Sequence, residues 1–196
     1  MNSRATIDGP FAALSAHVRA FRDRAAETEA VAALAPGPDD HVLAVGFGPG
    51  VGVARLAERI TRGRLAGVDP SARMLHRAGR RIRRLGADGR VELRRGTCVR
   101  LPWPDGRFDG VLSVNTLPLW EPFDVSAREV ARVLRTGGRF VSYTRQGVLR
   151  RVAAGGVEDW VRQVGEVFTA SGFTNVHSWR GRAESGRIVA LTATRV

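Results

Sequence analysis

Glycine at alternate positions of a short turn is the feature of this sequence that most directly indicates ligand binding. Gly46, Gly48 and Gly50 follow the apolar run 42–45, which suits a strand buried on both faces. Glycine adopts backbone angles that other residues avoid, and it lets a ligand approach the main chain closely. After the turn, apolar residues recur at helical spacing, at Val53, Leu56, Ala57 and Ile60. The order strand, glycine turn, helix predicts a ligand-binding corner of a doubly wound sheet.

The spacing of these glycines also indicates the kind of ligand. The dinucleotide fingerprint G-x-G-x-x-G has its third glycine where this sequence has Val51, so the pattern present is G-x-G-x-G. Pro49 removes one backbone donor from a loop that would hold a pyrophosphate. Both features favour a nucleoside ligand without phosphates over a nicotinamide dinucleotide.

A carboxylate follows the glycine turn at the distance expected of a ribose ligand. The apolar run 65–68 predicts a second strand, and it ends at Asp69, about 20 residues after the turn. An acid at this place accepts hydrogen bonds from both ribose hydroxyls. The alternative is that Asp69 or Ser71 caps the helix that follows, which runs to Leu85. Spacing and sequence order favour the ribose-binding role.

The elements that position these residues predict one α/β domain over residues 1–196, with an N-terminal cover (1–38) and a core (39–196). Further strands are predicted at 91–94, 108–115, 140–143, 174–179 and 187–194, with helices between them. Ser126 and Glu129 have the spacing of a capping box, which predicts the start of a helix that ends near Arg135. The short connection 181–186 predicts an antiparallel C-terminal hairpin. The expected fold is a Rossmann-like, doubly wound, seven-stranded, mostly parallel sheet. The amphipathic pattern over 10–34 predicts a helix that either covers the ligand site or packs on the sheet edge.

Composition bounds the remaining possibilities. The single cysteine, Cys98, excludes an internal disulfide and a cysteine-cluster zinc site, and no metal is expected. No apolar run is long enough for a transmembrane helix and residues 1–10 lack a signal-peptide pattern, so a cytoplasmic protein is expected. The net charge of +12 comes with 31 basic residues, all of them arginine. A basic stripe on the helix before Leu85 is interpreted as a solvated face; it comprises Arg73, Arg77, Arg80 and Arg84.

Four segments in this order resemble the class I S-adenosylmethionine-dependent methyltransferases. They are 42–50, 67–75, 101–109 (L-P-W-P-D-G-R-F-D) and 129–138 (E-V-A-R-V-L-R-T-G-G). The likeness covers roughly 39–143 and is greatest to the small-molecule, ubiquinone-biosynthesis-like branch.

The resemblance implies S-adenosylmethionine as the cofactor and a role for each motif. The turn would hold the methionine portion through Val45, Gly46, Phe47, Gly48 and Gly50. Asp69 would bind the ribose hydroxyls. The adenine would lie near Pro70 and Met74 and be read at Thr97 and Cys98, with Asn115 beside the reactive methyl group.

Three positions depart from the family pattern. Ala44 stands where the family usually has Asp or Glu, an acid that helps orient the methionine portion. Thr97 stands where Asp is common, and its hydroxyl accepts a hydrogen bond without charge. Phe47 replaces a small residue or cysteine. These departures leave the fold prediction unchanged and motivate one alternative, a binding or regulatory protein that kept the fold without catalysis.

The sulfonium is already an activated methyl donor, so the chemistry requires mainly in-line placement of donor and acceptor. No catalytic residue is assigned, because none of the candidate bases His17, His76, His177 and Tyr143 has supporting spacing. Apolar segments predict a small, partly hydrophobic acceptor, with His17, Leu117, Trp120 and Tyr143 as candidate contacts. The net charge motivates a second alternative, an RNA or DNA methyltransferase, although no N-P-P-Y-type motif follows the fourth strand. The sequence does not indicate an oligomeric state.

Overall fold

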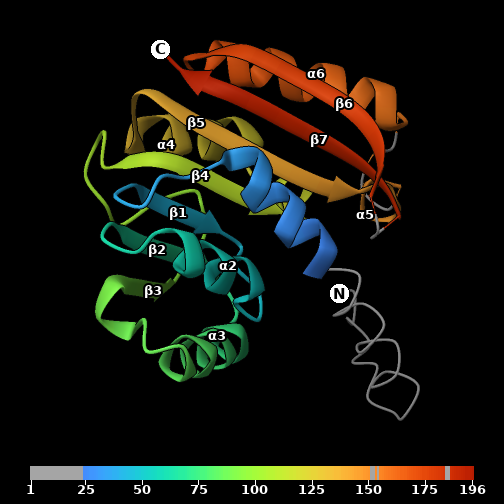
Figure 1. Cartoon of the computed structure of the whole chain (residues 1–196). Coiled ribbons are helices and arrows are strands. Elements are labelled where there is room, and N and C mark those ends of the chain that lie inside the picture. The colour runs from blue at the N-terminus through green and yellow to red at the C-terminus, as the bar shows by residue number, and fades with distance from the viewer. Residues whose placement is uncertain (1–23, 151–152, 154, 184–185) are drawn as a thin grey trace, which may run out of the picture.

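The computed structural model describes residues 24–150, 153, 155–183 and 186–196. Over these residues the chain forms a seven-stranded sheet in the order β3-β2-β1-β4-β5-β7-β6 (Figure 1). The strands are β1 (His41–Val45), β2 (Arg64–Asp69), β3 (Val91–Arg95), β4 (Phe108–Val114), β5 (Leu134–Arg145), β6 (Phe173–Ala183) and β7 (Gly186–Arg195). The helices are α2 (Val51–Arg59), α3 (Ala72–Arg84), α4 (Phe123–Val133), α5 (Gln146–Leu149) and α6 (Val157–Ala170), with short 3-10 turns η1 (Asp88–Arg90) and η2 (Leu117–Leu119).

The pairing of the strands confirms the predicted fold class. β1 pairs in parallel with β2 and with β4, while β2 pairs in parallel with β3 and β4 with β5. β7 runs antiparallel to both β5 and β6, as expected of a C-terminal hairpin. The central strands are buried on both faces, which is why their sequences read as continuous apolar runs.

Helices cover both faces of the sheet and enclose two apolar cores (Figure 1). On one face α2, α3 and the N-terminal helix, described over residues 24–34, pack on the sheet; on the other face lie α4 and α6. Ala26, Ala30, Val31 and Leu34 bring the N-terminal helix into the first core. The division into a cover and a core at residue 38 stays a prediction. None of the helices in the described part of the chain is both long and apolar enough to span a bilayer.

One sequence interpretation of a helix start is wrong. The spacing of Ser126 and Glu129 is that of a capping box, but α4 already begins at Phe123, with Pro122 as its N-cap. Glu129 instead accepts a hydrogen bond from the Leu101 N–H at 2.7 Å. Glu129 therefore binds a residue distant in the sequence instead of the start of its own helix, and it stabilises the loop between β3 and β4.

The loop between β3 and β4 is fastened to α4 by one arginine. Arg132 donates to the Leu101 carbonyl at 3.1 Å, to the Trp103 carbonyl at 2.9 Å and to Asp105 at 2.6 Å. It also pairs with Glu129 at 2.8 Å, and this hydrogen bond is the main cause that holds the pKa of Glu129 below its ordinary value of 4.5. The family-like segment 101–109 is therefore held in place by α4.

Arg132→Met is expected to lower the free energy of unfolding by about 2 kcal/mol, because buried carbonyls and Glu129 lose a charged donor. Arg128→Met is the matched control on the same helix; Arg128 is 59% exposed and pairs with Asp124, so we expect a loss of about 0.5 kcal/mol or less. Urea unfolding at neutral pH measures both. Because the pKa of Glu129 is lowered in the folded protein, its contribution to the free energy of unfolding is present at neutral pH and is lost on acidification. Equal losses of unfolding free energy in both variants would contradict the conclusion that Arg132 holds this loop on α4.

Candidate active-site cleft

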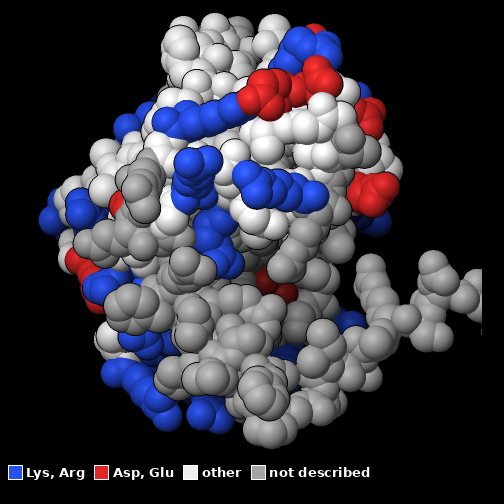
Figure 2. Space-filling view, turned by 90° about the vertical axis from the view of Figure 1, so that its right-hand side faces the viewer, with Lys and Arg blue, Asp and Glu red and all other residues white. Residues whose placement is uncertain are grey.

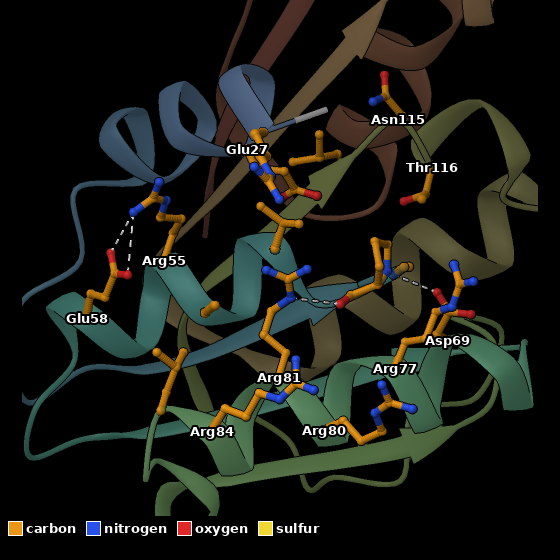
Figure 3. Close-up of a pocket in the computed structure, with 18 of the residues that line it drawn as sticks. Glu27, Arg55, Glu58, Asp69, Arg77, Arg80, Arg81, Arg84, Asn115 and Thr116 are labelled. Atoms are coloured by element: carbon orange, nitrogen blue, oxygen red, sulfur yellow. Dashed lines mark hydrogen bonds and ion pairs between the residues drawn. The ribbon is translucent and has the colours of Figure 1, made fainter. Parts of the chain in front are cut away.

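A cleft of about 900 Å³ opens at the carboxyl ends of β1, β2 and β4 (Figure 3). Its lining includes the turn after β1, Asp69 at the end of β2, and Asn115 with Thr116 after β4. Ligands of doubly wound sheets bind outside the carboxyl ends of the strands, where the strand order reverses. Here β1 lies between β2 and β4, so the order reverses beside the glycine turn.

The structure explains why glycine is present at each of the three positions of the turn. Gly46, Gly48 and Gly50 have φ values of +69°, +52° and +80°, the left-handed region that favours glycine. A Cβ at Gly46 would lie 2.7 Å from the Thr116 Cβ, and one at Gly50 would lie 2.7 Å from the Ala78 Cβ. A Cβ at Gly48 would meet nothing within 4 Å. Gly46 and Gly50 therefore allow close packing, whereas Gly48 leaves open space along the cleft.

Asp69 connects the end of β2 to the glycine turn. Its side chain is 6% exposed. One carboxylate oxygen accepts from the Gly48 N–H at 2.8 Å, and the other accepts from the Ser71 N–H at 2.9 Å. The helix cap is Ser71, whose hydroxyl accepts from the Met74 N–H at 3.3 Å. A carboxylate has about four lone-pair sites, so Asp69 keeps acceptor capacity for ribose hydroxyls while it orders the turn.

The bulky Phe47 lies outside the cleft. Its ring is 4% exposed and packs in the first core against β2, where a Cβ at Gly67 would lie 2.7 Å from the Phe47 ring. Gly67 therefore makes room for a phenylalanine below the turn. Val45 is buried in the second core, so neither of these side chains occupies the space beside Gly48.

Glu27 brings a carboxylate to the cleft that the sequence patterns did not identify. It belongs to the N-terminal helix and lines the cleft above the start of α2 (Figure 3). Its side chain lies so close to Gly52 that any Cβ there would overlap it. Ala44, where the family usually has an acid, is buried at 4% exposure. A signal existed in the sequence, since Gly52 is a glycine within the first turn of a helix, but only the fold relates it to Glu27.

Asn115 and Thr116 form the edge of the cleft at the end of β4. Asn115 has φ +60°, an angle that asparagine tolerates better than most residues, and its side-chain oxygen accepts from the Arg145 N–H at 2.9 Å. Thr116 donates to the Val45 carbonyl at 2.9 Å, which joins the ends of β4 and β1. Asn115 was predictable from its place at the end of a strand, whereas Thr116 was not, because a single threonine carries no spacing signal.

The other candidate contacts lie at the same sheet edge or in the cores. Pro70 and Thr97 are exposed after β2 and β3, Met74 is half-buried against the first core, and Cys98 is buried in the second core. Their assignment to the adenine stays a prediction.

The acceptor candidates are placed away from the cleft. Leu117 and Trp120 are buried in the second core. Tyr143 is buried in the first core and packs edge-to-face on Trp179. None of these three lines the cleft over the described residues. His17 lies outside the described residues. Leu117 and Trp120 therefore pack into the core, and contact between these candidates and an acceptor stays a prediction.

Two buried groups are unsuited to proton abstraction at neutral pH. Burial raises the pKa of the Tyr143 hydroxyl, and the charge of Glu29 adds to this effect. Burial also raises the pKa of the Cys98 thiol. Both groups therefore stay protonated. Within the described ranges, no three His, Cys, Asp or Glu side chains gather in a way that could hold a metal ion.

Comparisons with known proteins agree with this geometry. A family model described as a methyltransferase domain matches residues 42–138. YdaC, an uncharacterized methyltransferase of Bacillus subtilis, is 31% identical over 137 residues, which cover 70% of this chain and 73% of that protein. A solved S-adenosylmethionine-dependent methyltransferase of Aquifex aeolicus shares the fold with a TM-score of 0.72 at 17% identity, covering 92% of this chain and 98% of that one. The chain belongs to the class I S-adenosylmethionine-dependent methyltransferases.

This methyltransferase also resembles enzymes with named acceptors, over part of their length. A fatty-acid O-methyltransferase of Mycolicibacterium smegmatis is 39% identical over 101 residues, which cover 52% of this chain and 35% of that protein. Because the match covers about a third of that enzyme, its acceptor is not transferred to this chain. The cofactor is S-adenosylmethionine, and the observed cleft fits it: Gly48 leaves open space, and Asp69 presents a carboxylate beside it.

Proposed function

We propose that this methyltransferase transfers a methyl group from S-adenosylmethionine to a small, partly hydrophobic acceptor that enters the cleft beside Asn115. The observation that carries the proposal is the open cleft in which Asp69 accepts from the Gly48 N–H at the switch point of the sheet. Apolar side chains along the cleft support an acceptor with an apolar part; they are Val51, Ala54, Leu85 and Val114.

The residues of the chain would act by binding and orientation. S-adenosylmethionine supplies an activated methyl group on a positively charged sulfur. The glycine turn would hold the methionine portion, and Asp69 would accept from the ribose hydroxyls. Asn115, at the end of β4, would border the path along which the acceptor approaches. Correct placement alone lowers the barrier substantially, and a general base is needed only for an acceptor that must lose a proton.

Glu27 supports the proposal where the family acid is missing. A carboxylate above the first turn of α2 lies at the end of the cleft expected to hold the methionine portion. There it would accept hydrogen bonds from the α-ammonium group, which is positively charged at neutral pH. Glu27 would thereby take the orienting role that Ala44 cannot fill.

Glu27→Gln is expected to weaken S-adenosylhomocysteine binding by about tenfold, because a charge-assisted hydrogen bond becomes a neutral one. Glu58→Gln is the matched control: Glu58 also lines the cleft, and it pairs with Arg55 at 3.0 Å. We expect the control to bind the ligand as the wild type does. Calorimetric titration of both variants checks the assignment. A Glu27→Gln protein with wild-type affinity would remove Glu27 from the methionine site.

One labelling assay distinguishes the proposed function from its two alternatives. Isotopically labelled S-adenosylmethionine is incubated with the protein and either a small-molecule extract or the total RNA and DNA of the source cells. We expect label in a small molecule and none in RNA or DNA. Label in RNA or DNA alone would establish the nucleic-acid alternative, which the net charge of +12 motivates. Cofactor binding without labelled product in either fraction would favour the binding or regulatory alternative.

A further inference from the structure

Arginine dominates the charged lining of the cleft. Among the described residues, seven arginines and three carboxylates line it. The carboxylates Asp69 and Glu58 already have partners, in the Gly48 and Ser71 N–H groups and in Arg55. The lining therefore carries an excess of positive charge that its own acids do not balance. A cleft with walls of one sign concentrates ligands of the opposite sign.

The excess charge is concentrated on one helix. Arg77, Arg80, Arg81 and Arg84 of α3 all line the cleft and project along one side of it (Figure 3). Blue side chains also gather at the lower left of the face in Figure 2, at the height of α3 in Figure 1. Three members of the sequence stripe, all except Arg73, thus border the cleft. The interpretation of the stripe as a solvated face does not describe these three fully.

The spacing of these arginines is unfavourable for the helix alone. Positions three and four apart on a helix are neighbours, and like charges there repel. Arg80 is such a neighbour of both Arg77 and Arg84. The helix dipole favours cations in the last turn, which accounts for Arg84, but it does not account for Arg77 and Arg80 in the middle of α3. No described side chain pairs with Arg77, Arg80 or Arg84. A bound anion would relieve this repulsion.

The arginine side of the cleft is joined to the cofactor side. Arg81 donates from its Nε to the Pro49 carbonyl at 3.2 Å, so α3 is fastened to the glycine turn. A Cβ at Gly50 would collide with Ala78 of the same helix, which shows how closely the turn and α3 approach. A ligand held by α3 therefore lies next to the cofactor turn and not at a remote surface.

We propose that the methyl acceptor carries an anionic group, a phosphate or a carboxylate, and that Arg77, Arg80 and Arg84 bind it. This inference rests on the proposed methyl transfer and names the class of its acceptor. Guanidinium groups bind both anions with paired hydrogen bonds. A compact anion is favoured over a nucleic acid, because Glu27, Glu58 and Asp69 lie in the same concavity and would repel a continuous phosphate backbone. The apolar lining would hold the remainder of the acceptor.

The test uses inorganic pyrophosphate and citrate as probes, titrated separately into the whole protein at low ionic strength with and without saturating S-adenosylhomocysteine. We expect at least one probe to bind, and to bind equally well when S-adenosylhomocysteine is present, because acceptor and cofactor occupy the cleft together. Tighter binding of pyrophosphate indicates a phosphate-bearing acceptor, and tighter binding of citrate indicates a carboxylate. Absence of binding by both probes, or competition with S-adenosylhomocysteine, would overturn the inference.

Two substitutions on α3 distinguish a specific anion-binding site from non-specific attraction of anions by the positive charge of the protein. Arg80→Gln removes a charge that lines the cleft, and Arg83→Gln removes the same charge from an exposed position of α3 outside the lining. Arg80→Gln should weaken binding of the probe about tenfold. Arg83→Gln should change it by less than about twofold, because salt and water screen a charge that makes no contact. Equal losses would overturn the inference, as would an RNA oligonucleotide that binds more tightly than either probe and loses affinity in both variants.

Both variants should bind S-adenosylhomocysteine as the wild type does. Binding of S-adenosylhomocysteine therefore tests the proposed function separately from the anionic acceptor. Failure of the wild type to bind S-adenosylhomocysteine would refute the proposed function itself. Normal S-adenosylhomocysteine binding without selective loss of the probe in Arg80→Gln would refute the anionic acceptor alone.

Discussion

Asp69→Ala is expected to weaken S-adenosylhomocysteine binding by tenfold to a thousandfold, which corresponds to about 1.5 to 4 kcal/mol. Two charge-assisted hydrogen bonds to the ribose hydroxyls would be lost, and the Gly48 N–H would lose the acceptor that orders the turn. The free energy of unfolding should also fall by about 2 kcal/mol, because the partly buried Gly48 and Ser71 N–H groups lose their charged acceptor. The structure therefore adds a stability cost that a simple helix cap would not produce.

The control for this prediction is Ser71→Ala, which removes the actual cap of α3. Its hydroxyl accepts only the Met74 N–H among the hydrogen bonds described for it, so the expected cost is about 1 kcal/mol of stability with unchanged affinity. Titration calorimetry and urea unfolding are measured on the same preparations. Wild-type affinity in folded Asp69→Ala protein would show that Asp69 is structural and that the ribose assignment is wrong.

Gly46→Ala and Gly48→Ala are expected to separate packing from ligand binding. At Gly46 the new Cβ would lie 2.7 Å from the Thr116 Cβ at a φ of +69°, so we expect a loss of about 2 to 5 kcal/mol in stability. At Gly48 the new Cβ meets nothing, and only the left-handed strain of about 1 to 2 kcal/mol applies. That Cβ would instead project into the space that the cofactor is expected to occupy.

The measurements are the free energy of unfolding and the affinity for S-adenosylhomocysteine. Gly48→Ala should remain folded and lose most of its affinity, while Gly46→Ala should lose its fold first. If Gly48→Ala bound the ligand as tightly as the wild type, the cofactor could not lie over this turn. If Gly46→Ala were as stable as Gly48→Ala, the contact with Thr116 would not constrain the turn.

The fold was predictable because its signals are local. Four apolar runs with little polar interruption indicate parallel strands buried on both faces, and the short connection after Gly181 indicates the antiparallel hairpin. The glycine turn and Asp69 were predictable for the same reason, since a strand places its carboxyl end at a known edge of the sheet. The structure places both at the cleft.

The residues that the sequence did not identify depend on tertiary contacts. Glu27 reaches the cleft only because the N-terminal helix crosses α2 at Gly52. Thr116 matters because β4 ends beside β1, where its hydroxyl bonds the Val45 carbonyl. The arginines of α3 read as a solvated stripe, since helical periodicity identifies a polar face but not what borders it. Glu129 was misread for a related reason: a local capping pattern competed with a tertiary partner, Leu101.

We expect the cleft at the carboxyl ends of β1, β2 and β4 to bind the methyl donor. Calorimetric titration of the wild-type protein with S-adenosylhomocysteine measures this binding. The expected result is one site per chain with a dissociation constant in the micromolar range, and protection of the turn around Gly48 from amide hydrogen exchange in the complex. Absence of binding at millimolar ligand, or binding without protection at Gly48, would contradict it.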